Sequence, residues 1–136
     1  MSSSTQEPLL HKGNKHTDER GTITYNNDFD ATSIKRIYTI ENLSTDFKRG
    51  WQGHKIEQRW FSAMKGRFVI EVKPIIAFEQ SRLDSSVHTF LLEDTTLDYL
   101  QVPAGHVTRI QALEKGAKLL VLSDYHLGEI QDEYRF

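Results

Sequence analysis

Hydrophobic and polar residues alternate over short stretches of this chain, and turn residues separate these stretches. In residues 66–74, Phe68, Ile70 and Val72 fall on one face and mostly charged residues fall on the other. A period of two is typical of a strand with one buried face. Further segments of this kind are predicted at residues 34–40, 86–94, 96–103, 106–113 and 117–124. Because no segment keeps a helical period, and because Gly116 predicts a hairpin turn, we expect no helix.

Short strands separated by turns about every ten residues favour a β-sandwich or a small barrel. A length of 136 residues corresponds to one domain. Residues 1–17 are polar and offer little to bury, so we expect a polar N-terminal arm there and the folded domain over 18–136.

The composition narrows the class of function. The 17 basic and 19 acidic residues give a net charge of -2, which argues against a partner that is a nucleic acid. The chain has no cysteine, so disulfides and thiolate metal sites are excluded. No apolar run approaches the roughly 20 residues that cross a bilayer, and the N-terminus lacks the apolar centre of a secretion signal. We therefore expect a cytoplasmic protein with no membrane partner.

Polar residues on the predicted strand 34–40 raise the first question about function. Arg36 and Tyr38 share a face with Ile34 and Ile40. If this face lines a barrel, an arginine lies inside, where it needs an anion or another partner. In the alternative register Arg36 faces solvent and Ile37 faces the core, and the spacing leaves both open.

The segment "RGWQGHKIEQRW" (49–60) carries the densest group of candidate residues. Gln52 and His54 are two apart, so on a strand both side chains point the same way. Downstream, "VPAGHVT" (102–108) supplies a second turn with a P-x-G pattern.

These two segments resemble the two motifs of the cupin superfamily, which implies a jelly-roll barrel, also called a double-stranded β-helix. In metal-binding cupins, two histidines, an acid and a later histidine hold the metal. The matching positions here are Gln52, His54, Gln58 or Arg59, and Thr108. Because one imidazole is a poor divalent-metal site, we expect no metal and no cofactor. A metal cupin such as a dioxygenase is the weaker alternative.

Within the superfamily, the chain resembles metal-free cupins that act on nucleotide-linked deoxysugars. Two segments resemble the dTDP-4-dehydrorhamnose 3,5-epimerases. They are "DERG" (18–21) and the "RG" of residues 49–50 with the strand that follows, where Arg59 stands at the position of a lysine that points into the barrel in that family. "IKRIYTIENL" followed by "RGWQGHK" resembles the dTDP-4-keto-6-deoxyhexose 3,4-ketoisomerases more closely. This resemblance implies a dTDP-sugar ligand and a homodimer.

Two departures from these families bear on activity. Gln52 replaces the histidine that serves both groups as the base, and an amide is not basic near neutral pH. Leu120 falls at the place of the tyrosine acid of the 3,5-epimerases. The resemblance then leaves His54 as the base and Tyr38 as a second catalytic residue. The candidate substrate-binding residues are Arg20, Arg36, Arg49, Gln52, Arg59, Arg67 and Arg135.

Two functions follow from this pattern. The first is a sugar-nucleotide isomerase that performs 3,4-ketoisomerisation through an enediolate, in deoxysugar or surface polysaccharide biosynthesis. The second is a non-catalytic cupin that binds a sugar nucleotide and has lost its base at Gln52. Each candidate also has a structural alternative, because His54 can be a paired polar residue of the barrel and Arg49 can brace its turn. The remaining histidines are expected at the surface or in packing.

Overall fold

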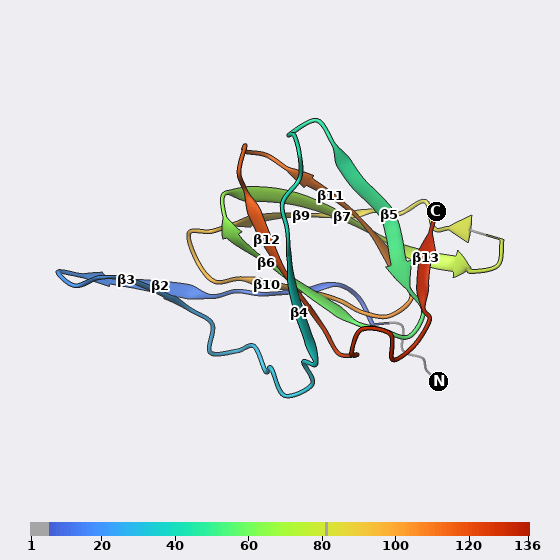
Figure 1. Cartoon of the computed structure of the whole chain (residues 1–136), viewed down its shortest axis with the longest axis horizontal. Coiled ribbons are helices and arrows are strands. Elements are labelled where there is room, and N and C mark those ends of the chain that lie inside the picture. The colour runs from blue at the N-terminus through green and yellow to red at the C-terminus, as the bar shows by residue number, and fades with distance from the viewer. Residues whose placement is uncertain (1–5, 81) are drawn as a thin grey trace.

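The computed structural model describes residues 6–80 and 82–136, which form two curled antiparallel sheets that face each other (Figure 1). The first sheet has the order β1 (Leu9–His11), β10 (Tyr99–Val102), β6 (Arg59–Lys65), β12 (Lys118–Ser123) and β4 (Arg36–Ile40). The second has the order β13 (Glu133–Arg135), β5 (Lys48–His54), β11 (His106–Ala112), β7 (Arg67–Ala77) and β8 (Arg82–Leu83), with β9 (His88–Glu93) also on β7. All regular elements among the described residues are strands, so the all-β, single-domain prediction is confirmed.

The hydrophobic core lies between the two sheets and is built by the alternation seen in the sequence. Phe68, Ile70 and Val72 of β7 are fully buried, as predicted. They pack in one cluster with apolar residues of the opposite sheet, including Phe61 on β6 and Leu119 on β12. The predicted strands therefore agree with the observed ones apart from their ends.

Strand β4 directs its polar residues into the barrel. Tyr38 and Ile40 pack against the core cluster, whereas Ile37 is 65% exposed. The register against β12 places Tyr38 opposite Val121, which belongs to the core. Of the two registers that the sequence left open, the structure has the one with Arg36 and Tyr38 on the inner face.

Two glycines let strand β5 lie directly against β11. A Cβ atom on Gly53 would overlap the carbonyl oxygen of His106, and one on Gly50 would overlap the carbonyl oxygen of Thr108. Gly50 also has a φ of +143°, a conformation that disfavours side chains. The "RG" and "GH" pairs of the sequence thus bring Gln52 and His54 against β11.

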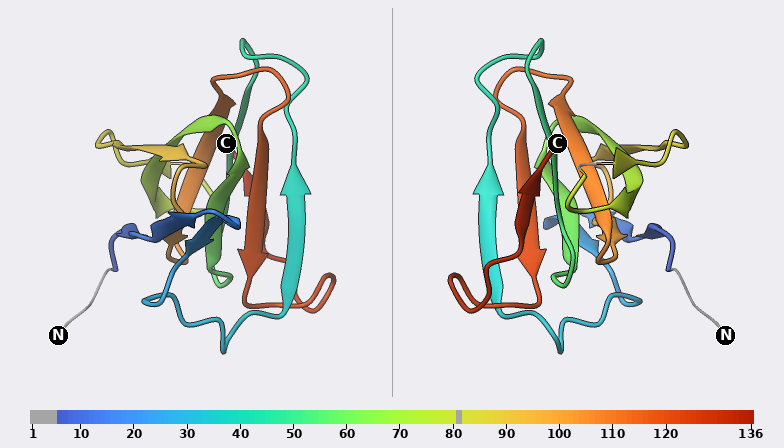
Figure 2. Two further views of the ribbon diagram at one scale, coloured as in Figure 1. Left: turned by 90° about the vertical axis from the view of Figure 1, so that its left-hand side faces the viewer. Right: turned by 90° about the vertical axis from the view of Figure 1, so that its right-hand side faces the viewer.

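The hairpin formed by β2 (Asn14–Asp18) and β3 (Gly21–Tyr25) projects away from the barrel (Figures 1 and 2). Strand β1 precedes it and pairs with β10 in the first sheet. The division into an arm over 1–17 and a domain over 18–136 stays a prediction. No helix among the described residues is long and apolar enough to span a membrane.

Truncation of a core isoleucine tests the packing of this barrel. We expect Ile70→Ala to lower the free energy of unfolding by about 2–5 kcal/mol, because it leaves a cavity at a fully buried site. Ile37→Ala is the matched control and should cost less than about 0.5 kcal/mol, since Ile37 is mostly exposed. Chemical denaturation of both variants measures the difference, and equal losses would contradict the assigned inner face.

Candidate functional site

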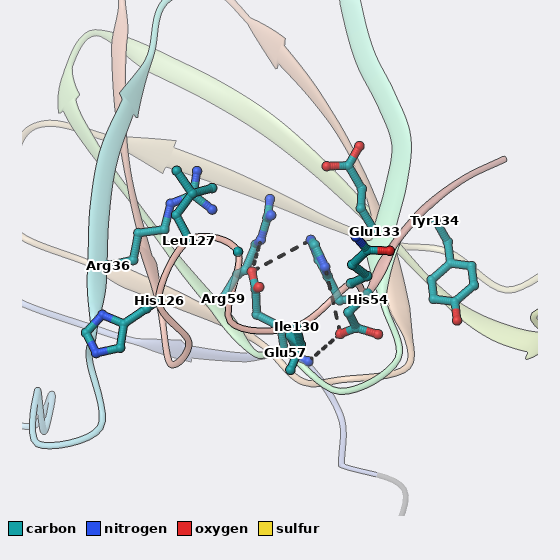
Figure 3. Close-up of a pocket in the computed structure, with 12 residues that line it drawn as sticks. Arg36, His54, Glu57, Arg59, His126, Leu127, Ile130, Glu133 and Tyr134 are labelled. Atoms are coloured by element: carbon teal, nitrogen blue, oxygen red, sulfur yellow. Dashed lines mark hydrogen bonds and ion pairs between the residues drawn. The ribbon is translucent and has the colours of Figure 1, made fainter.

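Two neighbouring cavities lie where the C-terminal segment crosses the barrel. The larger, which we call the tail cavity, has a volume of about 480 Å³. It is lined by Arg36, His54, Glu57, Arg59 and residues 126–128 and 130–134 (Figure 3). The smaller, which we call the barrel cavity, has a volume of about 230 Å³. It is lined by Arg36, Tyr38, Ile40, Arg49, Gln52, Arg59, Thr108, Ile110, Leu127, Glu133 and Arg135.

The C-terminal segment is tied to the barrel by one buried carboxylate. Asp132 Oδ1 accepts a hydrogen bond from the backbone N–H of Lys55 at 3.0 Å. Its Oδ2 accepts two more, from the N–H groups of Ile56 and Glu57, both at 2.8 Å. Strand β13 then pairs with β5 and places Glu133 opposite His54. The segment therefore fixes the turn that follows His54.

His54 lies between two carboxylates at the wall of the tail cavity (Figure 3). Its Nε2 is 3.8 Å from Glu57 Oε2, and its Nδ1 is 3.9 Å from Asp132 Oδ2. Within the described part of the chain, both ring nitrogens are buried and have no hydrogen-bond partner. Two carboxylates are therefore near the imidazole, but among the described residues neither forms a hydrogen bond with it.

Burial lowers the pKa of His54 below its ordinary value of 6.5, and the nearby Arg59 lowers it further. Glu57, Asp132 and Glu133 act in the opposite direction but do not reverse the shift. The ring is therefore neutral near pH 7 and carries a free lone pair. A neutral, unpartnered imidazole has the protonation state that a general base needs.

Tyr38 lies between two guanidinium groups in the barrel cavity. The Cζ atoms of Arg36 and Arg59 are 4.5 Å and 5.8 Å from the centre of its ring. Burial raises the pKa of Tyr38, although both arginines oppose the shift. Its hydroxyl stays protonated near neutral pH and can donate a hydrogen bond.

Gln52 faces the barrel cavity and interacts with the C-terminal strand. The pKa of Glu133 is held below its usual range by a hydrogen bond from Arg135, against the effect of burial, and the neighbouring Gln52 amide lowers it further. The amide thus lies at the position of the missing base and close to a carboxylate. Next to it, Thr108 directs its hydroxyl to the carbonyl oxygen of Gln52 at 3.5 Å.

Four of the predicted arginines meet at the barrel cavity, namely Arg36, Arg49, Arg59 and Arg135. Four guanidinium groups around one cavity suit an anionic ligand, because they form charge-assisted hydrogen bonds with phosphate. The other two predicted arginines lie elsewhere in this chain. Arg20 is at the tip of the β2–β3 hairpin and bonds Asp18 at 2.7 Å, and Arg67 is 3.5 Å from Glu114.

The structure also places the other positions named from the sequence. Leu120 follows the core residue Leu119 on β12 and therefore points to the opposite face of the strand. The buried His106 directs Nδ1 to the carbonyl oxygens of Pro103 and Ala104. His126, expected at the surface, is exposed and lines the tail cavity. Among residues 6–80 and 82–136, no group of three potential ligands is arranged to hold a metal ion.

Sequence reasoning missed Glu57, Asp132 and Glu133. For Glu57 a signal was present, because His54 and Glu57 are three apart across a turn. For Asp132 there was none, since its backbone partners lie 75 to 77 residues earlier in the chain. Arg135, a candidate substrate-binding residue from the sequence, lines the barrel cavity.

Comparison with known proteins identifies one family and several similar folds. The family FdtA, described as "WxcM-like, C-terminal", matches residues 6–135. No curated protein sequence matches the chain.

Three solved structures illustrate the similarity of fold. A histidine-to-asparagine mutant of the 3,4-ketoisomerase QdtA from Thermoanaerobacterium thermosaccharolyticum, in complex with TDP-4-keto-6-deoxyglucose, has a TM-score of 0.73 and 23% identity, over 98% of this chain and 90% of that one. The TDP-quinovose 3,4-ketoisomerase WlaRB from Campylobacter jejuni has a TM-score of 0.69 and 20% identity, over 97% of this chain and 95% of that one. A dTDP-4-dehydrorhamnose 3,5-epimerase from Bacillus anthracis, with TDP and PPi bound, has a TM-score of 0.72 and 14% identity, over 92% of this chain and 76% of that one. The predicted cupin barrel is confirmed.

Removal of the Asp132 carboxylate tests its role in tying the C-terminal segment to the barrel. Asp132→Ala leaves three backbone N–H groups without their acceptor, so we expect the free energy of unfolding to fall by about 2 kcal/mol or more. Asp124→Ala is the matched control, because Asp124 accepts one N–H, from Gln58. Thermal unfolding compares the two, and a smaller loss for Asp132→Ala would contradict the role.

Titration of His54 followed by NMR of its imidazole tests the electrostatics of the site. We expect a midpoint below pH 6.5, because burial and Arg59 disfavour the charged ring. The unfolded chain then binds this proton more readily than the folded protein. The contribution to stability is therefore present above pH 6.5 and is lost as the pH falls through the lowered pKa. A midpoint above 6.5 would contradict this, because it would show that the neighbouring carboxylates outweigh burial in setting the pKa. The His54→Asn variant assigns the NMR signal to His54, since that signal disappears.

Proposed function

Because the chain belongs to the FdtA family of WxcM-like C-terminal domains, we propose that it is an isomerase acting on a nucleotide-linked 4-keto-6-deoxysugar. The reaction moves the ketone from C4 to C3 of the sugar. One observation carries the proposal: His54 is buried, neutral and unpartnered among the described residues, at the wall of a cavity that adjoins a cluster of four arginines. This arrangement combines a base with a site for a diphosphate.

The proposed chemistry uses the lone pair of His54. The imidazole takes the proton from C3, an enediolate forms across C3 and C4, and the proton returns at C4. Negative charge develops on the sugar oxygens in the transition state, where fixed donors are most effective. Tyr38 and the guanidinium groups of Arg36 and Arg59 are the donors assigned to this charge, since they adjoin one another between the two cavities.

The proposed binding site for the diphosphate is the outer part of the barrel cavity. Arg49 and Arg135 lie there on the paired strands β5 and β13, and Arg36 faces them from β4. Support comes from the solved structures with a similar fold, several of which contain TDP or a TDP-sugar. Gln52 is assigned to hydrogen bonding of the sugar.

A homodimer completes this proposal. The β2–β3 hairpin extends away from its own barrel (Figure 1), and Arg20 and Ile23 are exposed on it. A second copy of the chain is the proposed partner for this hairpin, and Arg20 is then assigned to the phosphates of that copy. Arg67 lies outside both cavities, and nothing in the structure supports its assignment to the substrate beyond the sequence prediction.

The second candidate function is a cupin that binds a sugar nucleotide without turnover. Gln52 favours it, because the amide that replaces the usual base has no basic lone pair. The two candidates share the ligand and differ in the role of His54.

Incubation with dTDP-4-keto-6-deoxyglucose distinguishes them. We expect the wild-type protein to form the 3-keto isomer, detected by NMR of the sugar ring. His54→Asn should lower the rate by at least about 100-fold, as expected for loss of a general base, while calorimetry shows retained nucleotide binding.

Binding of the nucleotide sugar without any product would instead support the second candidate. Gln52→His then becomes informative, because a gain of activity would show that the missing base alone prevents turnover. Inversion at C3 and C5 would assign the protein to the epimerases, and absence of binding would contradict both candidates.

A further inference from the structure

The two carboxylates beside His54 differ in what holds them. Asp132 uses both oxygens to accept three backbone N–H groups, and its side chain is only 3% exposed. Glu57 accepts one side-chain hydrogen bond, from Arg59 Nε to Oε2 at 2.9 Å. Among the contacts of the described residues, Oε1 of Glu57 accepts no hydrogen bond. Protonation of Asp132 would weaken the turn that supports the site, whereas Glu57 can exchange a proton through a free oxygen.

Glu57 is also placed to meet a ligand. It lines the tail cavity together with His54 and Arg59, and its Oε2 lies 3.8 Å from the imidazole Nε2 (Figure 3). Arg59 lines both cavities, so it lies next to Glu57 in the tail cavity and next to the other arginines in the barrel cavity. A sugar ring beside His54 would present neighbouring oxygens to Glu57.

The proposed reaction needs two kinds of proton transfer. One proton moves from C3 to C4, and a second moves from the hydroxyl on C3 to the former carbonyl oxygen on C4. His54 cannot hold the first proton and move the second at the same time, because its charged ring has no free lone pair. Gln52 has no basic lone pair either, so the hydroxyl proton must move through a different group, and Glu57 is the carboxylate that lies beside both His54 and Arg59.

We propose that Glu57 is a catalytic residue that carries the hydroxyl proton between the two sugar oxygens. This proposal rests on the function proposed above. His54 takes the C3 proton, and that electron pair forms the C3–C4 double bond while the carbonyl electrons move to O4. Glu57 takes the proton of the C3 hydroxyl and delivers it to O4. The O3 electrons then form the new carbonyl, and C4 takes the proton from His54. Every proton returns to the sugar, so no co-reactant is needed.

The charged groups around Glu57 are compatible with this task. Arg59 Nε holds Oε2, and His54, Asp132 and Glu133 lie on the side of β5 and β13. From β4, Arg36 lines the same cavity. Groups of both charges therefore face this carboxylate, and Arg59 holds it in place.

The ratio of hydrogen exchange to product formation tests the role of Glu57. The protein is incubated with dTDP-4-keto-6-deoxyglucose in heavy water, and NMR follows loss of the C3 proton and appearance of the 3-keto sugar. We expect Glu57→Gln to form product at least 100-fold more slowly while it keeps C3 exchange within about tenfold of wild type, because His54 still acts. The amide oxygen can still accept the hydrogen bond from Arg59. Glu93→Gln, on β9 outside both cavities, is the matched control and should change neither rate.

A second variant makes the test independent of any damage caused by the amide. Glu57→Ala should lose product formation, and added formate should restore it in proportion to its concentration without a matching rise in C3 exchange. Thermal unfolding checks that both variants are folded.

Other results overturn the proposal in distinguishable ways. If Glu57→Gln forms product at nearly the wild-type rate, or loses exchange and product equally, Glu57 does not carry the hydroxyl proton. Failure of formate to restore product formation in a folded Glu57→Ala would also count against it. If the wild-type protein shows neither exchange nor product, the proposed function itself is wrong, and this role falls with it.

Discussion

The buried carboxylate of Asp132 is the constraint on which the site depends. It accepts the backbone N–H groups of three successive residues, Lys55 to Glu57, from a position 75 to 77 residues away in the chain. The contact accompanies the pairing of β13 with β5 and places the C-terminal segment along the wall of the tail cavity that carries His54. Because the turn carries Glu57 at its end, the same three hydrogen bonds place both groups of the proposed acid–base pair.

The electrostatics of the site depend on burial. Burial lowers the pKa of His54, although Glu57, Asp132 and Glu133 act in the opposite direction. Arg59 contributes to the same result and also pairs with Glu57, so the excess negative charge is partly balanced. On the opposite side of Arg59, the barrel cavity is dominated by guanidinium groups. The proposed ligand, with a neutral sugar and an anionic diphosphate, would need arginines in both cavities, and Arg36 and Arg59 line both.

The strands and the core were predictable from local pattern, which left a sandwich or a small barrel open; the cupin barrel and most of the site were not. Alternation identified Phe68, Ile70 and Val72 as core residues, because one face of a strand must be apolar to be buried. The register of β4 was left open, since Ile37 and Tyr38 are both able to pack and only the pairing with β12 decides between them. His54, Tyr38 and four arginines were identified through family resemblance and do lie at the two cavities. Asp132 was missed because its partners are backbone groups at long range, which leave no trace in local sequence.

A crystal structure of the His54→Asn protein with bound dTDP-4-keto-6-deoxyglucose tests the central claim most directly. The account predicts a sugar ring in the tail cavity, with C3 facing residue 54 and the C3 and C4 oxygens facing Glu57. The diphosphate should contact Arg36, Arg49 or Arg135 in the barrel cavity. A sugar bound outside the tail cavity, or turned so that neither C3 nor its oxygen approaches these two residues, would contradict the account.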